Sequence, residues 1–283
     1  MRISFIGMGL MGNPMAGRLL ANGYDLYVYN RTPEKAQSLR ELGAKIALSG
    51  SEAINLSNLI ILMLTDGKAV NEILFSNEEQ DFTGKTVIQM STILPEESFQ
   101  ISEKIKLKKG SYLEAPVLGS IPQAQEGKLL ILAAGDEELV HRNSEILSSL
   151  GYLHYFGEIK KASAVKLALN QLIAALSVAF STSLGIIQKE GIETEKFMEV
   201  LRKSPLYAPT YDLKLKNYLS RDFTKANFPV KHLLKDVQLV RREAEKVGVS
   251  TVSVEAIEKV LEETIKSGRA DEDYSALFTT IVP

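Results

Sequence analysis

The sequence of 283 residues contains no cysteine and no tryptophan, and it has only three histidines. The absence of cysteine excludes a disulfide framework, a thiol nucleophile and thiolate-bound zinc. The three histidines, His141, His154 and His232, are too few to favour a histidine metal cluster. We therefore expect no metal centre in this protein.

An excess of positive charge is also lacking. The 33 lysines and arginines stand against 35 aspartates and glutamates, which gives a formal net charge of −2. Binding to a phosphate backbone depends on an excess of cationic side chains. This balance therefore predicts that nucleic acid is not a partner.

Targeting and membrane-spanning signals are the third absence. The first residues show no apolar stretch ending in a small-residue cleavage site, which predicts a cytoplasmic protein. The apolar run from Leu172 to Ile187 is shorter than a bilayer-spanning segment and carries several hydroxyl side chains. We expect a buried helix there and no membrane association.

What the sequence does contain is typical of a soluble globular protein, with 45% hydrophobic and 24% charged residues. At about 150 residues per domain, its length indicates about two domains. Short apolar runs alternate with helix-period segments up to about Gly157, and helix-period segments alone follow. We predict a doubly wound α/β Rossmann domain at 1–160, with a mostly parallel sheet, and an all-α domain at 161–283, joined by a long interdomain helix.

The individual elements follow from these patterns. The expected strands are Arg2–Ile6, Tyr24–Tyr29, Leu59–Leu64, Thr86–Gln89, Tyr112–Pro116, Leu129–Ala133 and Leu153–Tyr155. The expected helices are Met11–Ala21, Pro33–Leu42, Lys68–Leu74, Pro95–Leu107, Glu137–Leu150, Ala162–Lys189, Glu193–Arg202, Pro229–Val247 and Ser253–Ser267. The helical half is too small to be stable by itself, and it contains the apolar segment Leu172–Ile187. From these two features we expect a homodimer or homotetramer.

The clearest local motif is Gly7-Met8-Gly9-Leu10-Met11-Gly12, between the first expected strand and the first expected helix. Gly7 suits a tight turn, Gly9 lets a pyrophosphate approach the backbone, and Gly12 lets the helix pack closely on the strand. A bare motif of this kind is weak evidence, but the strand-turn-helix context strengthens it. It predicts a dinucleotide site.

The second expected strand ends in Asn30-Arg31-Thr32, where the adenosine ribose of a dinucleotide lies. A carboxylate there accepts from the ribose 2′-hydroxyl, and none is present. Arg31, helped by the Asn30 amide and the Thr32 hydroxyl, can instead pair with a 2′-phosphate. This pattern favours NADP(H) over NAD(H).

Lys166 is unusual because it falls in the first turns of an apolar helix, where a cation meets the unfavourable end of the helix dipole. Burial and the dipole lower the pKa of such an amine, which suits it to proton transfer. Asn170 follows one turn later on the same face. By itself, a lysine whose stem packs while its ammonium reaches water explains the position at least as well.

Five segments in order, however, carry recognisable motifs. They are Phe5–Met15, Gln89-Met90-Ser91-Thr92, Glu114-Ala115-Pro116-Val117-Leu118-Gly119-Ser120, Lys166 with Asn170, and Lys231-His232-Leu233-Leu234-Lys235-Asp236. Together they resemble the β-hydroxyacid dehydrogenases, the family of 3-hydroxyisobutyrate dehydrogenase, and most closely its glyoxylate/succinic semialdehyde reductase branch. The resemblance implies hydride transfer from NADPH to a small anionic aldehyde acid, with Lys166 as general acid and Asn170 beside it, in a cleft between the domains.

The resemblance also implies the other site residues. Cofactor contacts are expected from Gly7, Met8, Gly9, Leu10, Met11, Gly12, Asn30, Arg31, Thr32, Met63, Leu64, Thr92 and Lys235. Substrate contacts are expected from Leu118, Gly119, Ser120, Lys166, Asn170, Phe228 and Asp236. Because neighbouring residues on a helix point about 100° apart, we expect no simple ion pair between Lys235 and Asp236.

Two departures from the family pattern bear on these expectations. Leu118 stands where the family has a substrate-binding serine, so the physiological substrate is open. Lys160-Lys161-Ala162 replaces a G-x-G turn, so this turn must avoid positive φ angles or accept strain. The two lysines are either attractors of an anionic substrate or ordinary solvated charges.

Four alternatives remain beside the main hypothesis. An NAD(P)-dependent 3-hydroxyisobutyrate-type dehydrogenase fits the same motifs, although Arg31 disfavours NAD. A 6-phosphogluconate dehydrogenase has a much longer helical part, and an imine reductase usually carries aspartate or tyrosine in place of Lys166. A non-catalytic nicotinamide-binding module stays open because of Leu118 and the missing glycines, although the presence of Lys166 and Asn170 disfavours it.

Overall fold

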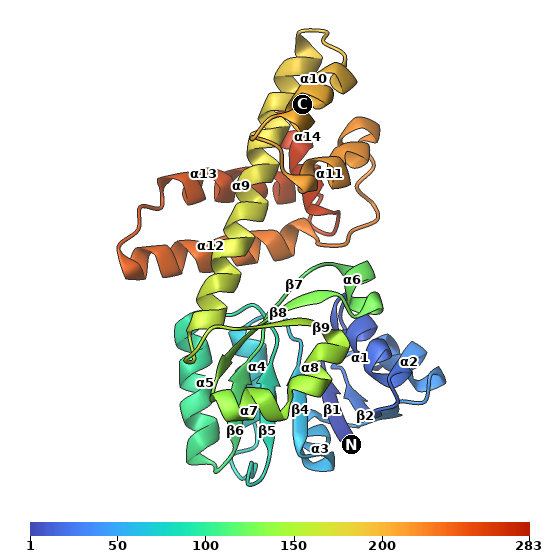
Figure 1. The fold of residues 1–283 in the computed structure, drawn as a ribbon, viewed down its shortest axis with the longest axis vertical. Coiled ribbons are helices and arrows are strands. Elements are labelled where there is room, and N and C mark those ends of the chain that lie inside the picture. Colours follow the sequence, from blue (N-terminus) through green and yellow to red (C-terminus); the bar gives the residue numbers. More distant parts are fainter. The chain divides into compact units, whose positions relative to one another are not determined.

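The computed structural model describes residues 1–283, and the chain divides into two compact units, Met1–Lys166 and Leu167–Pro283. Figure 1 shows strands and helices mixed in the first unit and helices alone in the second. The last strand ends at Tyr155, and only helices follow it.

The first unit is built on a nine-stranded sheet (Figure 1). Its strands are β1 (Arg2–Ile6), β2 (Asp25–Tyr29), β3 (Lys45–Ile46), β4 (Leu59–Leu62), β5 (Thr86–Gln89), β6 (Ser111–Glu114), β7 (Val117–Leu118), β8 (Leu129–Gly135) and β9 (Gly151–Tyr155). The order is β3-β2-β1-β4-β5-β6-β8-β7, with β9 paired to β8. Strands β1 to β6 pair in parallel, and β8 runs antiparallel to β6 and β7. The predicted, mostly parallel Rossmann sheet is confirmed.

Helices cover both faces of this sheet. They are α1 (Gly12–Ala21), the 3-10 turn η1 (Pro33–Ala36), α2 (Gln37–Glu41), α3 (Gly50–Leu56), α4 (Gly67–Phe75), α5 (Pro95–Leu107), α6 (Ile121–Glu126), α7 (Glu137–Arg142) and α8 (Ser144–Leu150). Successive residues of β4 enter different cores: Leu59 and Ile61 pack with α1, and Ile60 and Leu62 pack with α5. The unbroken apolar run of this strand is therefore explained by burial on both faces.

Several expected elements differ from the structure. The two-residue strands β3 and β7 were not expected, because so short a segment carries no periodicity. The helix expected over 137–150 is broken at Asn143, whose amide donates to the Leu139 carbonyl at 2.8 Å and so competes with the backbone ladder. The strand expected to reach Leu64 ends at Leu62, since the Leu64 N–H donates to the Ser91 hydroxyl instead.

The long helix α9 (Lys161–Lys189) begins in the first unit and continues into the second. The second unit adds α10 (Thr194–Lys203), α11 (Pro209–Ser220), α12 (Val230–Val247), α13 (Val252–Lys266), η2 (Tyr274–Leu277) and α14 (Phe278–Ile281). Helix α11, which starts with Pro209, was not among the expected helices. An aromatic cluster fills the core, where Phe180 stacks on Tyr211 at 4.5 Å and Tyr218 lies 5.2 Å from Phe278 between ring centroids.

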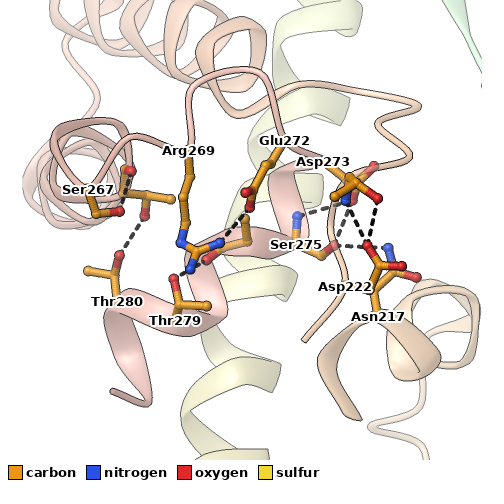
Figure 2. Close-up of polar contacts among 12 residues, drawn as sticks. Asn217, Asp222, Ser267, Arg269, Glu272, Asp273, Ser275, Thr279 and Thr280 are labelled. Atoms are coloured by element: carbon orange, nitrogen blue, oxygen red, sulfur yellow. Dashed lines mark hydrogen bonds and ion pairs between the residues drawn. The ribbon is translucent and has the colours of Figure 1, made fainter. Parts of the chain in front are cut away.

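A buried carboxylate anchors the loops of the second unit. Asp273 is fully buried. Its two carboxylate oxygens accept hydrogen bonds from the Lys214 ammonium, at 2.7 and 2.8 Å. It also accepts from the Ser275 hydroxyl at 2.7 Å and from the Asn227 N–H at 3.2 Å. Figure 2 shows Asp273, Ser275 and Asn217 gathered within this network. The carboxylate thus ties α11, the segment before α12 and η2 together.

Helix α9 is the one helix that is long and apolar enough, by length and composition alone, to cross a membrane. The helix extends well beyond the apolar run at 172–187, which by itself is shorter than a bilayer-spanning segment. Core helices of soluble proteins pass the same test. Its residues Leu172 and Ile186 are exposed in this chain. Self-association through this helix stays a prediction.

Candidate active site

The glycine turn between β1 and α1 has the geometry expected of it. Gly7 has φ +106°, and a Cβ there would lie 2.2 Å from the Met63 carbonyl oxygen. A Cβ on Gly12 would lie 1.8 Å from the Gly7 carbonyl oxygen. The chain itself therefore requires glycine at these two positions.

Gly9 is different, because a Cβ there would meet no atom within 4 Å. The protein leaves this side of the turn open, so the glycine is explained by a ligand that approaches the backbone and not by internal packing. The N–H groups of Leu10 and Met11, just before α1, donate no hydrogen bond within the protein. Open space beside free N–H groups at a helix start fits a pyrophosphate.

The Asn30 side chain organises this turn from the end of β2. Its Oδ1 accepts from the Met8 N–H at 2.9 Å, and its Nδ2 donates to the Thr32 carbonyl at 2.8 Å. Arg31 and Thr32 are exposed, and the Thr32 hydroxyl does not cap the turn that follows. Arg31 is therefore available to a ligand phosphate, whereas the Asn30 amide already holds the glycine turn in shape.

The carboxyl ends of β4 and β5 meet beside the turn. The Met63 N–H donates to the Ile6 carbonyl at 2.9 Å, which places Met63 next to the end of β1. The Leu64 N–H donates to the Ser91 hydroxyl at 2.7 Å, which joins the loop after β4 to the Ser91-Thr92 segment after β5. The structure thus brings the predicted cofactor residues Met63, Leu64 and Thr92 to the same sheet edge as the glycine motif.

The Leu118-Gly119-Ser120 segment lies between β7 and α6. Gly119 has φ +142°, and a Cβ there would lie 2.7 Å from Leu129. Ser120 is the residue before α6, and its N–H and its hydroxyl both donate to Gln123 Oε1. The Ser120 N–H is thus already used within the protein, whereas the Gly119 N–H has no partner there.

Lys166 lies in the second turn of α9 and is only 7% exposed. The start of this helix is held by Glu114, the last residue of β6, which is fully buried. Glu114 Oε1 accepts from the Ala162 N–H at 2.9 Å, and Oε2 accepts from the Ser163 hydroxyl at 2.6 Å. A buried carboxylate therefore satisfies N–H groups that a helix start leaves without partners.

The backbone of the turn before α9 is strained at Lys160. Lys160 has φ +90°, a conformation that favours glycine. Its ammonium lies 3.0 Å from Glu96 Oε2 and 4.1 Å from the centroid of the Phe99 ring. One of the two lysines that replace the family's glycine turn is thus tied to α5.

In the second unit, Asn170 and Asp236 form a buried pair. Asn170 Nδ2 donates to Asp236 Oδ2 at 2.6 Å, and Asn170 Oδ1 is buried without a hydrogen-bond partner. Lys235 Nζ lies 2.7 Å from Asp236 Oδ1, so the expectation that these neighbours do not pair was wrong. The flexible lysine stem reaches back around the helix, which the angle between adjacent residues does not capture. Phe228 is partly buried beside Tyr274, at 5.9 Å between ring centroids.

Sequence reasoning did not assign a role to three polar residues of this site: Ser98, Glu114 and Ser163. The sequence places Glu114 within a motif but indicates no role for its side chain. A carboxylate that ends an apolar strand was the available signal, but its partners on α9 lie 48 and 49 residues away.

Comparison with known proteins agrees with this geometry. The family model described as the NAD binding domain of 6-phosphogluconate dehydrogenase matches residues 2–159. The model described as NAD-binding of NADP-dependent 3-hydroxyisobutyrate dehydrogenase matches residues 161–281. The two matches together cover nearly the whole chain.

Individual relatives point the same way. Glyoxylate/succinic semialdehyde reductase 2, chloroplastic, of Arabidopsis thaliana is 33% identical over 99% of this chain and 79% of its own length. Glyoxylate/succinic semialdehyde reductase 1 of the same plant is 32% identical over 99% of this chain and 98% of its own. Among solved structures, the 3-hydroxyisobutyrate dehydrogenase of Mycobacterium tuberculosis with L-serine has a TM-score of 0.89 at 20% identity, covering 100% of this chain and 99% of that one. The last likeness concerns the fold alone.

Proposed function

This chain belongs to the β-hydroxyacid dehydrogenase family of NAD(P)-dependent oxidoreductases, and from that premise we propose that it reduces small aldehyde acids, such as succinic semialdehyde or glyoxylate, with NADPH. The observation that carries the proposal is Lys166, a lysine 7% exposed in the second turn of α9. Asn170 follows one turn later on the same helix. Placing an amine there lowers stability through burial and the helix dipole, and a role in proton transfer would explain why it is present.

The cofactor fits the residues that are present. The open side of Gly9 and the free N–H groups of Leu10 and Met11 would hold the pyrophosphate. A bound nicotinamide supplies hydride to the carbonyl carbon of the substrate. Arg31, exposed at the end of β2 with no carboxylate beside it in the sequence, supports NADPH over NADH.

The chain's own residues then complete the reaction. Lys166 donates a hydrogen bond to the carbonyl oxygen, stabilises the negative charge that forms on it and gives up a proton to the alkoxide. In the reverse direction the neutral amine removes the proton from the hydroxyl group. Asn170 Oδ1, buried without a partner, is available to a donor group of the substrate or to the Lys166 ammonium.

The substrate's carboxylate is proposed to lie at the Leu118-Gly119 segment. The Gly119 N–H is the donor left open there, because that of Ser120 binds Gln123. Leu118 offers no hydroxyl, so it favours an acid whose chain is apolar next to the carboxylate. Succinic semialdehyde, with two methylene groups, fits this better than glyoxylate.

The test compares the purified wild-type protein with Lys166→Met, which keeps the length of the stem and removes the amine. NADPH oxidation is followed with three aldehyde acids: succinic semialdehyde, glyoxylate and the aldehyde acid that corresponds to oxidised 3-hydroxyisobutyrate. We expect the variant to lose about 10²-fold or more in kcat while NADPH binding, measured by fluorescence titration, changes little. Lys189→Met, at an exposed position near the end of the same helix, is the matched control.

Two outcomes would contradict the proposal. Unchanged turnover in Lys166→Met would remove the lysine from the chemistry. Tight NADPH binding by the wild-type protein without turnover of any of the three aldehydes would favour a non-catalytic binding module instead.

A further inference from the structure

We propose that Glu114 is a positioning residue that fixes the first turn of α9 and thereby the direction of the Lys166 side chain. The inference rests on the role proposed above for Lys166. Glu114 itself contacts neither substrate nor cofactor in this proposal; it acts on the amine through the helix backbone.

The contacts of Glu114 are complete and buried. Oε1 accepts from the backbone N–H groups of Ala162 and Ser163, at 2.9 and 3.3 Å. Oε2 accepts from the hydroxyls of Ser163 and Ser98, each at 2.6 Å. All four residues are at most 2% exposed. Hydrogen bonds to a carboxylate in such a setting are stronger and more directional than neutral ones at a surface.

Helix geometry connects these contacts to the amine. Ala162 and Ser163 precede Lys166 by four and three residues, so all three lie on one face of α9. A carboxylate that binds the N–H groups of the first two fixes how the helix is rotated about its axis at this end. That rotation determines where the Lys166 stem starts. The first turn of a helix otherwise frays, because its N–H groups have no partners within the helix.

Glu114 also lies directly before the proposed substrate segment. It ends β6, and Leu118-Gly119 follows within five residues. One side chain thus joins the strand that leads to the substrate segment with the helix that carries the amine. A shift of about 1 Å between such groups lowers rates by about 10²-fold, so the connection matters to catalysis and not to stability alone.

The two serines provide a matched pair of variants. Each hydroxyl donates to the same Oε2 atom at 2.6 Å and each serine is buried, but Ser98 lies on α5 and Ser163 on α9. Ser98→Ala and Ser163→Ala therefore remove the same interaction on two different elements. Ser98→Ala also removes the 2.9 Å hydrogen bond with the Tyr112 hydroxyl, so it is expected to lower the unfolding temperature at least as much as Ser163→Ala.

The experiment measures kcat and KM for both variants and for Glu114→Gln, with NADPH and the best aldehyde acid. We expect Ser163→Ala to lower kcat about ten-fold and Glu114→Gln to lower it at least as much, with the KM for NADPH within about two-fold of wild type. Ser98→Ala should keep kcat within about two-fold, although it is destabilised at least as much as Ser163→Ala. Ser163→Thr, which restores a hydroxyl, should recover part of the loss.

A second readout does not require turnover. Reductive methylation of Lys166, followed by mass spectrometry at a fixed pH, should be faster in Ser163→Ala and Glu114→Gln than in wild type, and unchanged in Ser98→Ala. Equal kcat values and equal labelling rates in the two serine variants would overturn the positioning role. If the wild-type protein turned over no aldehyde, the proposed function would fail while the labelling rates would still decide whether Glu114 holds Lys166.

Discussion

Asn170 donates its amide hydrogen to the carboxylate of Asp236 at 2.6 Å, and both side chains are buried. The hydrogen bond fixes which end of the Asn170 amide is free: the oxygen, which has no partner. Asp236 thus sets the orientation of the Asn170 amide, one helical turn after Lys166, so that its oxygen is the atom left without a partner. Lys235, 2.7 Å from the other carboxylate oxygen, balances the buried charge.

Replacing Asp236 by Asn should weaken catalysis by releasing this amide. An asparagine presents a donor as easily as an acceptor, so Asn170 no longer has one preferred orientation. We expect kcat/KM for the aldehyde acid to fall about ten-fold, with NADPH affinity nearly unchanged. Steady-state kinetics test this, with the exposed Glu245→Gln on the same helix as control. Equal values for both variants would show that Asp236 does not orient Asn170.

Arg31→Asp should reverse the preference between the two cofactors. A charge-assisted pair with a 2′-phosphate contributes about 1.5–3 kcal/mol, so NADPH affinity should fall at least about ten-fold, whereas NADH affinity should hold or improve. Fluorescence titration with each cofactor measures the change. Arg40→Asp introduces the same charge change at another exposed position of this unit. Equal losses for NADPH and NADH would mean that Arg31 does not contact the phosphate.

The parts of the fold that were predictable are those whose determinants are local. Helix α5 spans Pro95–Leu107 and β5 spans Thr86–Gln89 as the sequence indicates, because a first-turn proline and an apolar run mark them directly. The glycine turn was predictable for the same reason. The two-residue strands β3 and β7 were not, since they exist only through pairing with neighbouring strands.

The site was predictable to a smaller extent. The motifs identified Lys166 and Asn170, but the partners that hold them come from distant segments: Glu114 for the start of α9 and Asp236 for the Asn170 amide. Such contacts depend on the packing of the sheet and helices, which no local pattern encodes. At the turn before α9, the sequence does not indicate whether the backbone avoids a positive φ angle. In the structure Lys160 adopts one, so the turn is strained.

Lys160 offers a direct measurement of that strain. A left-handed conformation costs a non-glycine residue about 1–2 kcal/mol. Lys160→Ala and Lys160→Gly both lose the ion pair with Glu96, so their difference isolates the backbone. We expect the glycine variant to be the more stable by about 1 kcal/mol in urea unfolding. At Lys161, the first residue of α9, the same two substitutions should show alanine at least as stable as glycine. The same order at both positions would contradict the assignment of strain to Lys160.

Asp273→Asn should be the most destabilising of these substitutions. It leaves the Lys214 ammonium, with a side chain only 13% exposed, without its opposite charge. Breaking a buried pair by removing one partner costs about 3–5 kcal/mol, which for a chain of this size lowers the unfolding temperature by about 10 °C. Asp222→Asn, at an exposed aspartate in the same unit, should change the unfolding temperature far less.

Calorimetry measures the unfolding temperature of both variants, and NADPH titration should show that the first unit still binds its cofactor. Combining Asp273→Asn with Lys214→Met should recover part of the loss, because the double variant no longer buries a lone charge. If the two aspartate variants unfolded at the same temperature, the Lys214–Asp273 pair would not hold the second unit together.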